Sequence, residues 1–78
     1  MSADDLFWRR VHRRAGDLTA AQARAFYKAL EALRVYLSEP EIEALLVIGD
    51  ANGILPDVVL TQAFTAFRAR LQMTVADA

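Results

Sequence analysis

A helix over residues 39–48 is delimited by the chain's own residues more sharply than any other part of the sequence. Ser38 is a typical N-cap, Glu41 stands three residues later as a capping box requires, and Pro40 fits a first turn, where no amide hydrogen is needed. Gly49 offers the left-handed conformation in which helices commonly end. A start and a stop this close together predict a short helix with tight connections on both sides, which favours an all-helical fold.

Apolar residues recur at spacings of three and four residues in two longer segments, as they do on the core-facing side of a helix. The first series is Ala23, Phe26, Leu30, Leu33 and Leu37. The second series is Leu60, Phe64, Phe67 and Leu71. Thr19 with Gln22 predicts a capping box before the first series, and Pro56 suits the first turn of the second.

A further helix is expected near the N-terminus, where Ser2 can cap a segment that carries Phe7 and Val11 four residues apart. The sequence therefore predicts an all-α fold, a compact bundle of four main helices in a single domain over residues 1–78. The predicted helices cover residues 3–14, 20–37, 39–48 and 56–73. The segment from Asp50 to Leu55 is predicted either as one extra short helical turn or as a loop.

Composition limits how such a bundle can be stabilised. The chain has 78 residues, of which 55% are hydrophobic and 24% are charged. This apolar fraction is generous for so small a core, so part of the apolar surface is expected to face a partner. The chain contains no Cys, which excludes a disulfide and a thiolate metal site.

The N-terminal residues do not read as a signal peptide, because Asp4 and Asp5 stand where such peptides carry bases. The longest uninterrupted apolar run, Ala44 to Ile48, is far shorter than the roughly 20 residues that span a bilayer. We therefore expect no signal peptide and no membrane span.

Charge is distributed unevenly along the chain. Residues 1–34 carry seven bases and four acids, whereas residues 35–67 carry five acids and no base. Such asymmetry favours oriented docking on a neighbour with complementary charge, and this neighbour could be another copy of the chain. A plain solvated surface remains the default interpretation of these charges.

No set of residues in the sequence is typical of catalysis. His12, the only His, lies among arginines, with no sign of a nucleophile beside it. Glu39, Glu41 and Glu43 are two residues apart and cannot share one side of a helix. The run Asp50-Ala51-Asn52-Gly53 places its glycine too early for a calcium loop. We therefore expect no enzymatic activity, no cofactor and no metal site.

The candidate partner-binding residues lie in the first predicted helix, and they are Trp8, Arg9, Arg10, Arg13 and Arg14. Exposed Trp and Arg side chains are common at the centres of protein interfaces, and Arg also recognises phosphates. The sequence isoelectric point of about 5.7 argues against autonomous DNA binding. A simple solvated face is the leading interpretation of these arginines. Among binding partners, an acidic protein surface is favoured over an accessory contact to DNA.

Three segments in order carry a resemblance to a known family. They are a core helix that begins Leu18-Thr-Ala-Ala-Gln, the stretch Leu37-Ser-Glu-Pro-Glu-Ile-Glu-Ala-Leu-Leu, and the pair Gly49-Asp50 before an apolar helix. Over Leu18 to Leu71 this order resembles the N-terminal helical region of MuF-like minor head proteins, the head morphogenesis proteins of tailed phages.

The resemblance implies a non-enzymatic virion component that acts in assembly through contacts with the portal or capsid protein. It also implies a location in the virion or in the host cytoplasm. A small helical adaptor or inhibitor that binds a host protein is the alternative function.

Overall fold

The computed structural model describes the backbone of residues 3–77 and the side chains of residues 5–72. Within this range the chain forms four α-helices and no strand, which confirms the all-α fold. The helices are α1 (Ala3–Gly16), α2 (Ala20–Leu33), α3 (Glu39–Ala51) and α4 (Pro56–Asp77). The predicted N-cap Ser2 lies outside the described residues.

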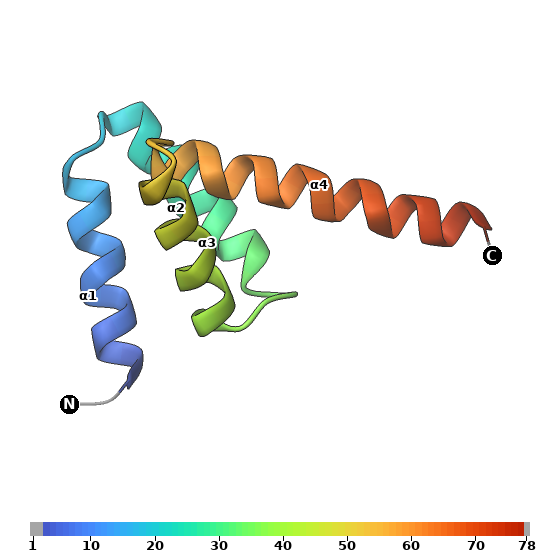
Figure 1. Ribbon diagram of the computed structural model, residues 1–78, viewed down its shortest axis with the longest axis horizontal. Coiled ribbons are helices and arrows are strands. Elements are labelled where there is room, and N and C mark those ends of the chain that lie inside the picture. Colours follow the sequence, from blue (N-terminus) through green and yellow to red (C-terminus); the bar gives the residue numbers. More distant parts are fainter. Residues whose placement is uncertain (1–2, 78) are drawn as a thin grey trace.

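The helices pack around α2 and the first half of α4 (Figure 1). The contact between α2 and α4 is the most extensive, α3 also packs on α4, and α1 lies against α2. The C-terminal half of α4 continues past the ends of the other helices and projects from the bundle (Figure 1). The molecule is therefore elongated, with principal extents of 43 × 28 × 22 Å.

The core contains part of the two predicted apolar series, namely Phe26, Leu30, Leu33 and Leu60. Every helix contributes, and the buried apolar residues are Phe7, Val11, Ala15, Phe26, Ala29, Leu30, Leu33, Ile42, Leu46 and Leu60. Along α4 burial decreases in steps: Leu60 is fully buried, Phe64 and Phe67 are half-buried, and Leu71 is exposed. The predicted apolar series on α4 therefore continues beyond the core that it enters.

Both predicted capping boxes are confirmed. Thr19 accepts a hydrogen bond from the backbone amide of Gln22, whose side chain accepts one from the amide of Thr19. Ser38 and Glu41 make the same reciprocal pair at the start of α3, with Pro40 in the first turn. Each box satisfies amide hydrogens that the first turn of a helix leaves without a partner.

The prediction that the second helix reaches Leu37 was wrong, since α2 ends at Leu33. The chain then turns, and the backbone amides of Tyr36 and Leu37 both donate hydrogen bonds to the carbonyl of Leu33. Val35 is left 76% exposed, while Leu37 turns back to pack against the core. The other three helices are longer than predicted, since α1 extends to Gly16, α3 to Ala51 and α4 to Asp77.

Gly49 was predicted to end the third helix, but α3 continues to Ala51 and Gly53 takes the left-handed conformation, with φ of 70°. The amide of Ile54 donates to the carbonyl of Gly49, and the amide of Gly53 donates to that of Asp50. These two bonds form a Schellman motif. The extra helical turn after Asp50 does not form, because residues 54 and 55 lead directly into α4.

Gly49 has a packing role instead. It is buried, and a Cβ atom at this position would overlap Cγ2 of Val59 on α4. Val59 is β-branched and has little freedom to rotate away. The absence of a side chain at Gly49 therefore sets how closely α3 and α4 approach each other.

We expect Gly49→Ala to lower the free energy of unfolding by about 1 kcal/mol, measured by urea denaturation. Overpacking costs about 1–3 kcal/mol, and the better helix propensity of alanine offsets about 1 kcal/mol of this. Gly16→Ala is the matched control, because a Cβ at Gly16 meets nothing within 4 Å. Adding Val59→Ala should reduce the cost of Gly49→Ala, and a strictly additive double variant would contradict the close contact.

The capping box of α3 should make stability depend on pH. Hydrogen bonds from the amide and hydroxyl of Ser38 lower the pKa of Glu41 from 4.5. A carboxyl group whose pKa is lower in the folded state stabilises the fold above its unfolded pKa, and this contribution disappears as the pH falls. Below pH 4.5 we therefore expect the melting temperature of the wild type to fall more than that of Glu41→Gln.

Gln at position 41 can keep the capping box but does not titrate, which makes it the suitable comparison. Glu31→Gln serves as the control, because the exposed Glu31 carboxylate accepts no hydrogen bond within the described part of the chain. Parallel pH profiles for wild type and Glu41→Gln would contradict the prediction.

Candidate functional site

The five candidate residues on α1 point in three different directions. A helix turns by 100° per residue, so residues three, four and seven apart share a side. Phe7 and Val11 face the core, which places Arg14 toward α3 and Trp8 toward α2. Arg9 and Arg13 remain on the outer side. The structure therefore does not gather the predicted set into one surface.

Arg14 links α1 to α3 within the molecule. Its side chain is only 19% exposed, and its guanidinium lies 2.5 Å from Asp50 Oδ2 and 3.7 Å from Glu43 Oε1. Arg10 adds a longer contact of 3.8 Å to the same oxygen of Glu43. Arg14 thus has two acidic partners in its own chain and is the least available of the four arginines.

Trp8 fills the junction of α1 and α2. It is half-buried and packs edge-on against Phe7. The guanidinium of Arg34 lies over its ring, with Cζ 4.9 Å from the ring centroid. Next to it, His12 Nδ1 lies 2.7 Å from the hydroxyl oxygen of Tyr27. These contacts give Trp8 a structural role that explains its position, with one part of the ring still open to solvent.

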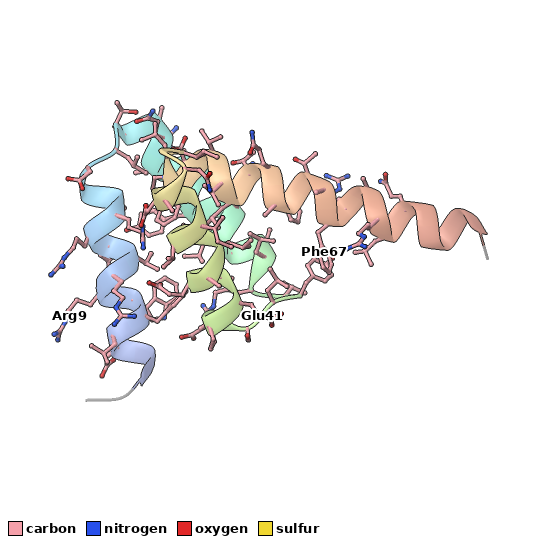
Figure 2. All side chains as sticks on the ribbon, in the orientation of Figure 1. Arg9, Glu41 and Phe67 are labelled. Carbon is pink, nitrogen blue, oxygen red and sulfur yellow. The ribbon has the colours of Figure 1, made fainter. Side chains whose placement is uncertain are left out.

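The outer side of α1 combines Leu6 with Arg9 and Arg13. Leu6 is 43% exposed, and both arginines are exposed. Neither arginine forms an ion pair or a hydrogen bond with another described residue. Figure 2 shows Arg9 pointing away from the other helices. We call these three residues the outer α1 surface.

The spacing of two acids on α3 is a sequence signal for the pairing of Arg14. Glu43 and Asp50 are seven residues apart, which is two helical turns, so both point from α3 in similar directions. A base on a neighbouring helix can reach both. The exposure of Leu6 and the position of Arg34 over Trp8 depend on how the helices pack. No spacing in the sequence indicates either of them.

Among residues 5–72 no three His, Asp or Glu side chains come together in a group that could hold a metal ion. Within the same part of the chain no helix has the length and apolar character needed to cross a membrane.

The outer α1 surface presents two guanidinium groups beside an apolar side chain, an arrangement suited to contact with an acidic surface.

The division of the arginines can be tested by stability. We expect Arg14→Met to lower the free energy of unfolding by about 1–2 kcal/mol, because it leaves Glu43 without its main cationic partner in a largely buried position. Glu43 Oε2 is already buried without a hydrogen-bond partner among the described residues. Arg13→Met, the matched control, should change stability by less than about 0.5 kcal/mol. Equal effects in chemical denaturation would contradict the division.

Compared with known proteins, the chain matches no family model, no curated protein sequence and no solved structure. The resemblance to minor head proteins therefore depends on the residues of the segment 18–71 alone. The functional proposal below is based on the exposed residues of the outer α1 surface.

Proposed function

We propose that the protein is a non-enzymatic assembly component that binds another protein through the outer α1 surface. The partner presents acidic groups to Arg9 and Arg13 and an apolar residue to Leu6. The resemblance to MuF-like minor head proteins points to the portal or another protein of a phage head as this partner.

One observation carries the proposal: Arg9 and Arg13 are exposed and have no partner among the described residues, although α3 of the same chain carries several acids. Exposed arginines beside an apolar residue are enriched at protein interfaces, because the guanidinium pairs with carboxylates and stacks on flat groups. Holding both on one side of a rigid helix reduces the entropy lost on binding.

A protein partner fits this surface better than DNA. Two of the four arginines of α1, Arg10 and Arg14, lie beside acidic groups of α3, so the positive field at this end of the molecule is partly neutralised. DNA binding draws most of its affinity from several phosphate contacts, and two free arginines supply few of them.

The experiment is a binding measurement with isolated portal rings and with purified heads. We expect the wild-type chain to bind, and Arg9→Glu with Arg13→Glu to weaken binding by about tenfold or more. Binding should also weaken as salt is added, since exposed charges are screened. The melting temperature of the double variant should stay near that of the wild type, because neither arginine has an internal partner.

Arg24→Glu with Lys28→Glu is the control for net charge, because both side chains are exposed on α2 and form no ion pair in the described part of the chain. It should bind as the wild type does. A chain that ignores portal rings and heads contradicts the proposed partner. Unchanged binding by Arg9→Glu with Arg13→Glu contradicts the proposed surface.

A further inference from the structure

The side of α3 that faces away from the core is apolar, and nothing in the described chain covers it. Val47 is 53% exposed and Ile48 is 59% exposed, and they are accompanied by the exposed Ala44 and Ala51. We call these four residues the outer α3 face. A helix that is apolar on all sides is normally buried on all sides. Exposed Ile54 and Leu55 extend the apolar surface at the end of α3.

Acidic groups border the outer α3 face. By helical spacing, Glu41 lies on the edge beside Ile48, and Asp50 lies on the edge beside Val47. Both acids are exposed. Arg14 of α1 pairs with Asp50, so the unpaired negative charge beside this face comes mainly from Glu41.

The projecting part of α4 has the opposite character. Phe67 and Leu71 are four residues apart and continue the apolar series of the core into solvent, where Leu71 is 40% exposed. Phe67 is covered on one side by Tyr36, at 5.0 Å between ring centroids. We call residues 67–72 the α4 arm.

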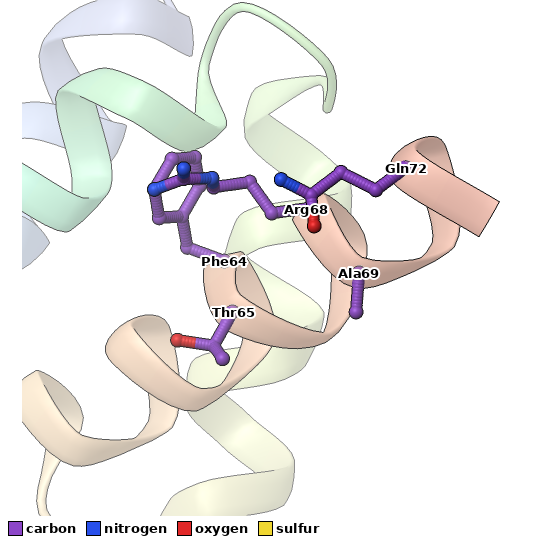
Figure 3. Close-up of a pocket in the computed structure, with 5 residues that line it drawn as sticks. All are labelled: Phe64, Thr65, Arg68, Ala69 and Gln72. Carbon is purple, nitrogen blue, oxygen red and sulfur yellow. The ribbon is translucent and has the colours of Figure 1, made fainter. Parts of the chain in front are cut away.

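Basic groups border the α4 arm. Arg68 and Arg70 flank the apolar series by helical spacing, and the sequence has no acid from residue 58 to residue 72. Beside Arg68 lies a shallow hollow lined by Phe64, Thr65, Arg68, Ala69 and Gln72, in which the Arg68 side chain points back toward Phe64 (Figure 3). All five residues belong to α4, so a single helix lines the hollow in the described part of the chain.

We propose that the outer α3 face is a docking site for the α4 arm of a second copy of this chain. An apolar stripe edged by Glu41 and by Asp50, the latter shared with Arg14, then meets an apolar stripe edged by arginines, so that hydrophobicity and charge agree. Within one copy this contact is blocked, since α4 begins just after α3 ends and runs away from the bundle as one continuous helix (Figure 1).

The contact is head-to-tail, because the two surfaces differ and lie at different places on each copy. Such interfaces lead to rings or chains, or to a reciprocal pair in which two arms are exchanged. The two surfaces lie on α3 and α4, apart from the outer α1 surface. This self-association is therefore separate from the binding of another protein proposed above.

Sedimentation velocity of the full chain tests the proposal. We expect the mass of the wild type to rise with concentration. Ile48→Glu should disable the face and Leu71→Glu the arm, and each should raise the dissociation constant by about 30-fold or more. Both positions are exposed, so circular dichroism should show folded chains. Arg9→Glu with Arg13→Glu should assemble as the wild type does.

Mixing the two variants gives the decisive result. The Ile48→Glu chain keeps an intact arm, the Leu71→Glu chain keeps an intact face, and one junction can form between them. We expect a one-to-one pair in the mixture and monomers in each variant alone. A wild type that stays monomeric overturns the proposal, as does assembly that survives either variant. A mixture that remains monomeric also overturns it, because a symmetric contact through a single surface would not be restored by mixing.

Discussion

The close approach of α3 and α4 at Gly49 and Val59 is the contact on which the rest of the arrangement depends. With no side chain at Gly49, Val59 lies against the backbone of α3 and the adjacent Leu60 enters the core. The left-handed Gly53 completes the reversal between the two helices. The direction of α4 is thus fixed in its first turn, and this direction decides which apolar residues of α4 cover α2 and which project beyond it.

The capping boxes and the apolar series were predictable from the sequence because they depend on neighbours within one or two helical turns. Thr19 with Gln22 and Ser38 with Glu41 are satisfied locally, whatever the rest of the chain does. Gly49 could not be assigned in this way. Both Gly49 and Gly53 are plausible ends of α3, and the contact with Val59 that decides between them comes from a different helix.

The candidate site was predictable only as a set of residues. Helical spacing showed that the four arginines cover a wide part of α1, but it could not show where α3 lies. The position of α3 pairs Arg14 with Glu43 and Asp50 and leaves Arg9 and Arg13 outside. The packing of α1 against α2 likewise places Trp8 between these helices, with Arg34 over its ring. Tertiary packing, and not residue type, divides structural arginines from available ones.

Four helices in this arrangement also leave surfaces that they cannot bury. Helix α3 has α4 on one side and the acid-arginine contacts with α1 on another, so its apolar outer face has no neighbour among the described residues. On the α4 arm Phe67 contacts Tyr36, but no further helix among the described residues covers the exposed Leu71. An acid-edged face and an arginine-edged arm that cannot meet within one chain can meet between two, and the separation of charge along the sequence then sets the polarity of the assembly.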